Sequence, residues 1–210
     1  MQDIGKITGI RITEDGMDMC VHVNNQNALE AIKSRHVNTI HMLYSDGRII
    51  TPIQRRKAYA LIKDISLHTG YLPEEAKEIM KYWYVQKTGE SYISLANCSI
   101  DDARKFINTL TDFCLEEGII TSDSLLEYTD DIHTYLYQCL VHKKCSICGK
   151  NGEIHHWDAI GMGNDRRVYD DRNNRKICLC RLHHTIAHQK GRADFAKDYH
   201  VYGIEYVRSE

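Results

Sequence analysis

Apolar and polar residues alternate along the first fifty residues of the chain, which is the period of β-strands. The segments 4–12 and 17–23 alternate on either side of Glu14-Asp15-Gly16, a pattern typical of a β-hairpin. We expect a short capped helix over 24–36 and a further strand over 38–44. The chain therefore begins with β-structure.

After residue 50 the apolar residues recur at helical spacing. The first such segment, 51–70, opens with Thr51 as N-cap, Pro52 and Gln54, which form a capping box, and it closes at Gly70. The apolar face predicted for this helix consists of Ile53, Tyr59, Ala60, Ile62 and Ile65. Similar start and stop signals predict three more helices, at 73–89, 99–118 and 122–141.

These elements predict an α+β fold. We expect a mixed strand and helix body over 1–120, a connecting helix over 121–140 and a cysteine-bearing module over 141–210. The chain has only two prolines and no run of glycine and serine, so no long flexible linker is expected between these parts.

The composition is that of a globular domain, with 42% hydrophobic and 27% charged residues. No stretch of 18 apolar residues predicts a membrane span, and the N-terminus does not resemble a secretory signal, so we expect a cytoplasmic protein. The net charge of −2 is unevenly spread, because residues 141–210 carry 13 lysines and arginines against 9 acids and hold seven of the twelve histidines. A basic, histidine-rich C-terminal part suits a phosphate-facing module.

Two pairs of cysteines predict a metal site, because disulfides are not expected in a cytoplasmic chain. Cys145 and Cys148 have the spacing of a zinc knuckle, and Cys180 and His183 repeat that spacing. Cys178 would face away from Cys180 in a strand. We therefore predict a structural Cys3His zinc site of Cys145, Cys148, Cys180 and His183, with Cys178 in place of His183 as the alternative.

Four further histidines predict a second metal site. His184 and His188 are four residues apart, so they share one face of a helix and can bind one ion. His155 and His156 are adjacent in an alternating segment, so one can join the ion while the other faces a substrate. Three histidines leave coordination positions open, which is typical of a catalytic metal site.

Two groups of basic residues are candidates for contacts with a phosphate backbone. One lies in the loop and strand after the histidine pair, and the other in the first turn of the helix that begins at Thr51, where backbone N–H groups are also unpaired. The candidates are Arg166, Arg167 and Arg175 in the first group and Arg55, Arg56 and Lys57 in the second.

The segment 145–190 resembles the HNH nuclease family, whose ββα-metal fold places a divalent cation against a scissile phosphate. The motifs that carry the resemblance are CSIC, IHHW, NNRKICLC and RLHHTIAH, in that order. The resemblance implies that His156 is the general base, and that His155, His184 and His188 surround the catalytic ion. It also implies that Asn174, or less well Asn173, orients the base.

The same resemblance implies the cofactors. The structural ion would be Zn²⁺ and the catalytic ion Mn²⁺ or Mg²⁺, with Zn²⁺ or Ni²⁺ as alternatives. The chain departs from many members of the family in having His183 where they have a fourth cysteine. This departure bears on the zinc ligands and leaves the catalytic set unchanged.

More of the chain is similar to HNH nucleases of Gram-positive bacteriophages, through IGMGNDRR, NRKICLCRLHH and YHVYGI. The helical body, with QRRKAYALIKDI, PEEAKEIMK and SLANCSIDDARKFINTLTDFCLEEGI, resembles the phage Orf (NinB) recombination-mediator family. These resemblances imply an endonuclease of phage recombination or replication in a bacterial host. Its implied partners are single-stranded or branched DNA, a second copy of the chain and a single-strand-binding protein of host or phage.

Three functions are consistent with the sequence. The leading hypothesis is a divalent-metal-dependent HNH endonuclease. The alternatives are a non-catalytic recombination mediator that binds single-stranded DNA, with the zinc-stabilised C-terminal module as a docking surface, and a zinc-stabilised adaptor between proteins. Cleavage of DNA distinguishes the first from the second, and binding of DNA distinguishes the second from the third.

Overall fold

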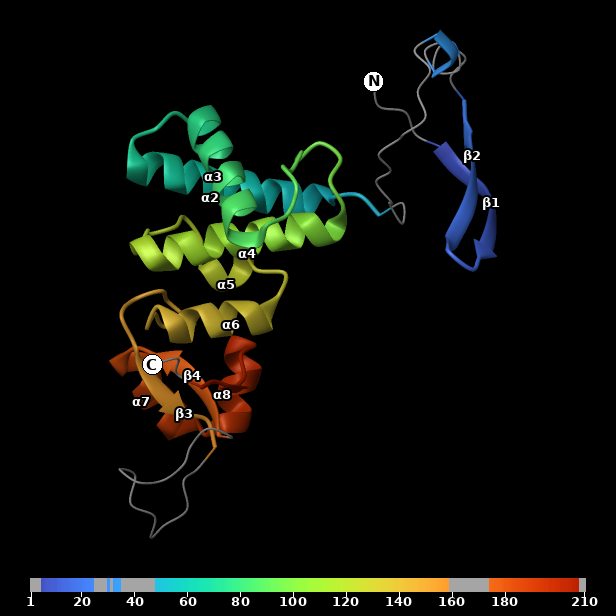
Figure 1. Ribbon diagram of the computed structural model, residues 1–210. Helices are drawn as coiled ribbons and strands as arrows, with labels where there is room; N and C mark the ends of the chain where they lie inside the picture. The colour runs from blue at the N-terminus through green and yellow to red at the C-terminus, as the bar shows by residue number, and fades with distance from the viewer. Residues whose placement is uncertain (1–4, 25–29, 31, 35–47, 159–173, 208–210) are drawn as a thin grey trace. The chain divides into compact units, whose positions relative to one another are not determined.

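The computed structural model describes residues 5–24, 30, 32–34, 48–158 and 174–207. The chain forms two compact units, Met1–Ser45 and Asp46–Glu210 (Figure 1). Helices and two small sheets are present, so the α+β fold is confirmed. The expected division at residues 120 and 140 stays a prediction. None of the helices in the described ranges is long and apolar enough to cross a membrane.

The first unit contains the expected hairpin. Strands β1 (Gly5–Thr13) and β2 (Gly16–Val23) pair antiparallel, and Thr13 lies opposite Gly16, so Glu14 and Asp15 form the turn. Of the helix expected over 24–36, the described residues 30 and 32–34 are helical. The strand expected over 38–44 lies outside the described residues.

Helix α2 (Pro52–Thr69) begins and ends as predicted. The Thr51 side chain accepts from the backbone N–H of Gln54, and the Gln54 side chain accepts from the backbone N–H of Thr51, which completes the capping box. Gly70 ends the helix in the left-handed conformation. The predicted apolar face was wrong at two positions, because Ile53 and Tyr59 are 56% and 44% exposed. The face that packs into the core is instead Gln54, Ala58, Leu61, Ile62 and Ile65.

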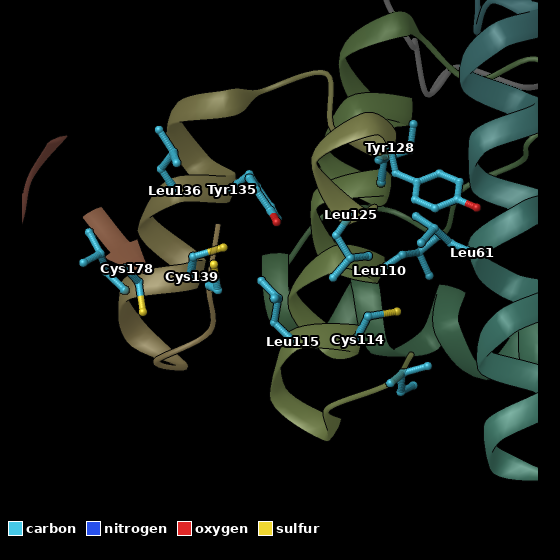
Figure 2. Close-up of a cluster of buried hydrophobic side chains, with 14 of the residues drawn as sticks. Leu61, Leu110, Cys114, Leu115, Leu125, Tyr128, Tyr135, Leu136, Cys139 and Cys178 are labelled. Atoms are coloured by element: carbon cyan, nitrogen blue, oxygen red, sulfur yellow. The ribbon is translucent and has the colours of Figure 1, made fainter. Parts of the chain in front are cut away.

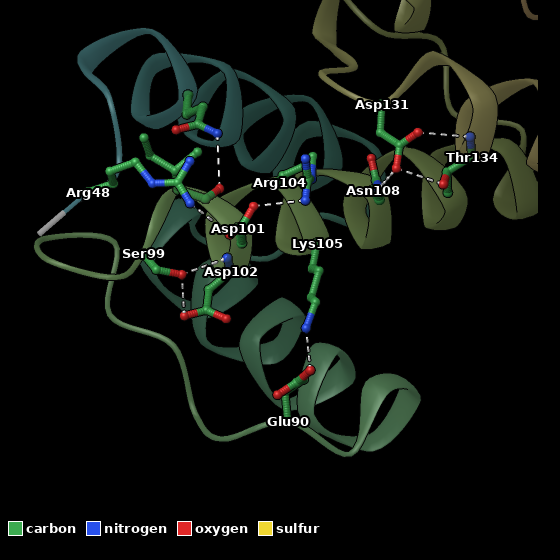
Figure 3. Close-up of polar contacts among 12 residues, drawn as sticks. Arg48, Glu90, Ser99, Asp101, Asp102, Arg104, Lys105, Asn108, Asp131 and Thr134 are labelled. Carbon is green, nitrogen blue, oxygen red and sulfur yellow. Dashed lines mark hydrogen bonds and ion pairs between the residues drawn. The ribbon is translucent and has the colours of Figure 1, made fainter. Parts of the chain in front are cut away.

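Helices α3 (Pro73–Thr88) and α4 (Ile100–Glu117) also agree with their sequence signals. Each ends at a glycine in the left-handed conformation, Gly89 and Gly118 respectively. Ser99 caps α4 by accepting from the backbone N–H of Asp102, as Figure 3 shows. Helices α2, α3 and α4 pack against one another and form the helical body of the second unit.

The single helix predicted over 122–141 is wrong: the segment forms a short α5 (Leu125–Tyr128) and a separate α6 (Ile132–Val141). Thr129 is extended, and Asp131 starts α6 as its N-cap. The Asp131 carboxylate accepts from the backbone N–H and the hydroxyl of Thr134, and Asn108 of α4 donates to it at 3.4 Å (Figure 3). An aspartate whose carboxylate accepts from a backbone N–H three residues ahead acts as a helix N-cap, so α6 starts at Asp131 as a separate helix.

The C-terminal part consists of β3 (Glu153–His156), β4 (Arg175–Leu179), α7 (Arg181–Lys190), α8 (Arg192–Tyr199) and β5 (Ile204–Glu205). β4 lies between β3 and β5, and both pairings are antiparallel. The buried Lys176 of β4 donates to the Tyr206 carbonyl at 3.0 Å, which ties the end of the chain to the sheet. A side chain at Gly203 would overlap the Trp157 ring, so only glycine allows this close approach.

One continuous hydrophobic core joins the helical body to the C-terminal sheet. Figure 2 shows this core running from Leu61 of α2 through Leu110 of α4 and Leu136 of α6 to Cys178 of β4. Helix α6 packs on α4 with one face and on β4 with another. The sheet is therefore supported by the helical body through α6.

A buried polar group reinforces this junction. The Asp112 carboxylate of α4 pairs with Lys87 of α3, and His142 Nε2 after α6 lies 2.8 Å from its Oδ1. Burial raises the pKa of Asp112, but the hydrogen bonds from His142 and Lys87 outweigh it and hold the pKa below its ordinary value of 3.8. The charged form of Asp112 therefore stabilises the fold at neutral pH.

We predict that Asp112→Asn lowers the free energy of unfolding by about 1–3 kcal/mol, because a buried acceptor of two donors is lost. Urea denaturation at pH 7 measures the change. A folded-state pKa below 3.8 means that the stabilisation is present above this pH and is lost as the pH falls below it. The difference between variant and wild type should therefore shrink in strong acid.

The matched control is Asp101→Asn in the same helix, since Asp101 is about half exposed and pairs with Arg104 and Arg48. Exposed ion pairs contribute less than about 1 kcal/mol. Equal destabilisation by the two substitutions would contradict a special role for Asp112.

Candidate functional site

The first cluster is built on a tight turn between α6 and β3. Gly149 N–H donates to the Cys145 carbonyl at 2.9 Å, and Cys145 N–H donates to the Lys150 carbonyl at 2.7 Å. Gly149 has φ +68, a conformation that glycine adopts without strain. The turn brings the thiols of Cys145 and Cys148 to the same side, as the C-x2-C spacing predicts.

Hydrogen bonds fix this turn against the sheet and the helical body. The backbone N–H and the hydroxyl of Ser146 both donate to the Cys178 carbonyl of β4, at 2.9 and 3.1 Å. The Tyr135 hydroxyl of α6 donates to the Ser146 carbonyl at 3.1 Å. Ser146 and Tyr135 are both fully buried, so the turn is held from two directions.

The ligand atoms of Cys145, Cys148, Cys180 and His183 all lie within 4.8 Å of one another. Cys148 and Cys180 sulfurs are 3.7 Å apart, and His183 Nδ1 is 3.4 Å from Cys145 Sγ and 3.3 Å from Cys180 Sγ. A tetrahedral zinc ion with bonds of about 2.0–2.3 Å requires separations of about 3.5–3.8 Å. The three separations lie within about 0.2 Å of this range, so the cluster could hold a metal ion.

The environment of the thiols also fits a cation. Burial raises the pKa of Cys145 to about 12. The pKa of Cys180 is lowered, because hydrogen bonds from the backbone at His183 and from Cys148 and Cys145 outweigh its burial. A metal ligand must be a thiolate, so a bound cation would compensate the cost of ionising Cys145.

Cys178 does not belong to this cluster. Its side chain is fully buried in the core, and burial raises its pKa above the ordinary value. The geometry therefore places His183 among the four converging groups, and Cys178 among the apolar residues.

The second cluster consists of His155 of β3 and His184 and His188 of α7. The His155 ring centroid is 4.5 Å from that of His184 and 4.9 Å from that of His188. The Nε2 atoms of His184 and His188 are 3.1 Å apart. Two imidazoles bound to one ion at about 2.1 Å have nitrogens about 3.0–3.4 Å apart for octahedral or tetrahedral angles, so this pair fits a shared metal ion.

His155 is the most buried member of the second cluster. Burial, reinforced by the neighbouring His184 and His188, lowers its pKa to about 4. The imidazole is therefore neutral at physiological pH, and a neutral imidazole is the form that binds metal ions.

His156 lies on the other face of β3 from His155, because successive side chains in a strand point in opposite directions. His156 is half-buried and is paired in register with Lys176. Asn174 directly precedes β4. The side chains of His155 and His156 therefore point in opposite directions, as the alternating sequence pattern predicted.

An ion-pair group follows the histidine doublet. The Asp158 carboxylate accepts from the backbone N–H of Arg175 at 3.0 Å and from its guanidinium at 2.7 and 3.0 Å. Arg192 of α8 donates to the same carboxylate at 3.1 Å. The hydrogen bonds from Arg175 lower the pKa of Asp158 to about 2. This group joins the ends of β3 and β4 to α8.

The basic residues proposed for phosphate contacts have several environments. Arg175 pairs with Asp158, Arg55 donates to the carbonyls of Leu95 and Ala96, and Lys57 pairs with Asp130 at 2.6 Å. Arg56 is exposed. Arg166 and Arg167 lie outside the described residues.

Two charged residues beside the second cluster were not singled out from the sequence. Glu153 Oε1 is 2.7 Å from Nδ1 of His184, and Arg181, at the start of α7, lies 3.8 Å from the same carboxylate oxygen. The signal for Glu153 is its position two residues before His155, which places both on one face of a strand.

Strands β3 and β4 followed by α7 form a ββα module, with a Cys3His cluster at the helix start and three histidines between strand and helix, two groups that could each hold a metal ion. The family described as "Putative HNHc nuclease" matches residues 21–209, most of the chain, and the protein belongs to this HNH nuclease family. No curated protein and no solved structure matches the chain.

We predict that the first cluster binds one metal ion tightly and that Cys148→Ser removes it, since a hydroxyl is a much poorer ligand than a thiolate. Metal analysis after gel filtration should fall by about one ion per chain. The thermal midpoint should drop by more than about 5 °C, because each kcal/mol shifts it by about 2–4 °C in a domain of this size.

Two controls accompany this experiment. Cys20→Ser changes an exposed cysteine of β2 and should leave the metal content unchanged. Cys178→Ala should also retain the ion, although the small cavity lowers stability. Loss of the ion from Cys178→Ala with retention in His183→Ala would show that Cys178 is the fourth ligand.

Proposed function

We propose that the protein is a divalent-metal-dependent DNA endonuclease that hydrolyses phosphodiester bonds, with His156 as the general base. The observation that supports the proposal is the position of His155 and His156 on opposite faces of β3. His155 faces the cluster with His184 and His188, and His156 lies on the opposite face. Membership of the HNH nuclease family supports the same reaction.

The proposed roles follow from the chemistry of each group. His155, His184 and His188 would hold the catalytic ion, Mn²⁺ or Mg²⁺, with Zn²⁺ or Ni²⁺ as alternatives, and coordination positions would remain open for the substrate. A divalent cation bound there supplies stabilisation of negative charge on the phosphate and on the leaving oxygen. His156 takes the proton of the attacking water at a ring nitrogen, and Asn174 would orient the base.

The first cluster has a structural role in this proposal. Cys145, Cys148, Cys180 and His183 use all four tetrahedral positions of a Zn²⁺ ion, and a closed site of this kind contributes folding energy. His183 and His184 are neighbours on α7, so the position of one cluster sets the position of the other.

The substrate is proposed to be DNA of phage recombination or replication, in supercoiled, single-stranded or branched form. The basic charge of residues 141–210 supports a nucleic-acid substrate. The part over 1–120 is proposed to bind DNA, with Arg56 as the exposed candidate of its basic group.

We predict that His156→Ala lowers the rate of nicking of supercoiled plasmid with Mn²⁺ or Mg²⁺ by about 10²–10⁴-fold, the usual contribution of a general base. Binding of the same DNA in Ca²⁺ should be retained, because the substitution leaves the three-histidine cluster intact. Agarose gels measure the rate of nicking, and filter binding measures the affinity for DNA.

The matched control is His133→Ala, which removes one exposed imidazole from α6. It should cut like wild type. Equal cleavage by His156→Ala and wild type would contradict the general-base role. Salt-dependent binding of single strands without cleavage by any of the proteins would support the non-catalytic mediator instead.

A further inference from the structure

The carboxylate of Glu153 contacts one histidine of the second cluster and is not itself one of the three converging groups. Glu153 begins β3 and is paired in register with Leu179, two residues before the start of α7. It lies on the same face of the strand as His155. Its Oε1 atom is 2.7 Å from His184 Nδ1, within the range of a strong hydrogen bond.

This contact determines which nitrogen of His184 carries the proton. A neutral imidazole has one N–H group and one lone pair, and an ionised carboxylate can only accept. The Glu153 side chain is 54% exposed and lies between His184 and Arg181, so its carboxylate oxygen is the acceptor of this hydrogen bond. The proton is therefore on Nδ1, and the lone pair is on Nε2.

The other nitrogen of His184 faces the remaining ligands. His184 Nε2 is 3.1 Å from His188 Nε2, and the His155 ring lies edge-on to both rings. A lone pair on His184 Nε2 is therefore directed to the point where the three imidazoles converge. The opposite tautomer would direct an N–H group there and exclude a cation.

We propose that Glu153 is a positioning residue that fixes the Nδ1–H tautomer and the ring orientation of His184, and thereby sets the affinity of the three-histidine cluster for a divalent cation. The proposal rests on the proposed function in one respect, namely that this cluster binds a cation. Carboxylates that hold a histidine ligand in this way change metal affinity by about 10–100-fold.

The competing partner of Glu153 is Arg181. Its guanidinium lies 3.8 Å from Oε1 and its side chain is 90% exposed, so solvent screens the pair. The His184 contact is shorter by more than 1 Å and involves a side chain that is only 22% exposed. The Glu153 carboxylate therefore interacts mainly with His184.

The test compares Glu153→Gln with Glu205→Gln, which neutralises an exposed glutamate of β5 in the same sheet. Both full-length proteins are prepared with zinc in the first cluster. Selective ¹⁵N-histidine NMR without added metal should show His184 as the Nδ1–H tautomer in wild type and in Glu205→Gln. A mixture of tautomers is expected in Glu153→Gln, because an amide can both donate and accept.

Mn²⁺ binding, measured by electron paramagnetic resonance, should be weakened about 10–100-fold in Glu153→Gln and unchanged in Glu205→Gln. Retention of one zinc ion and of the thermal midpoint shows that Glu153→Gln is folded. An Nε2–H tautomer in wild type, or equal tautomers and equal Mn²⁺ affinity in the two variants, would overturn the proposal. If wild type binds none of Mn²⁺, Mg²⁺, Zn²⁺ and Ni²⁺ at the second cluster, the proposed function fails, and the tautomer of His184 still decides the role of Glu153.

Discussion

The site depends on the attachment of α7 to the cysteine turn. Cys180 caps the helix and His183 lies in its first turn, and both converge with Cys145 and Cys148. The next residue, His184, points to the other cluster, because neighbours on a helix differ in direction by about 100°. A metal ion in the first cluster would therefore fix both the rotation and the translation of the helix that carries two of the three histidines.

The cysteine turn in turn depends on the helical body. Ser146 is bonded to the Cys178 carbonyl of β4 and to the Tyr135 hydroxyl of α6, and all three residues are buried. Helix α6 is held against α4 by the apolar core and by the Asp112 group. This continuity explains why residues 46–210 form one compact unit.

Local signals predicted the helices well, because caps and glycines act within a few residues, as at Thr51, Gly70 and Ser99. Spacing also predicted which cysteines and histidines lie together, since C-x2-C and H-x3-H fix local geometry, and the two groups could each hold a metal ion. The break before α6 was missed because apolar periodicity continues through it, while the Asp131 carboxylate accepts from the backbone N–H of Thr134, three residues ahead, and so starts a new helix. The contact between Glu153 and His184 joins residues 31 positions apart, and no local pattern encodes such a pairing.

The charges around β3 explain why the proposed reaction needs a cation. A phosphodiester in attack gains negative charge, and arginine side chains often neutralise it. Here Arg175 and Arg192 are both bonded to Asp158, and Lys176 is buried with its ammonium on the Tyr206 carbonyl. These three cations are committed to holding β3, β4, α8 and the chain end together. Among the residues that the structure describes, the neutral His155 adds no positive charge to the second cluster, so in the proposed reaction a bound ion would supply it.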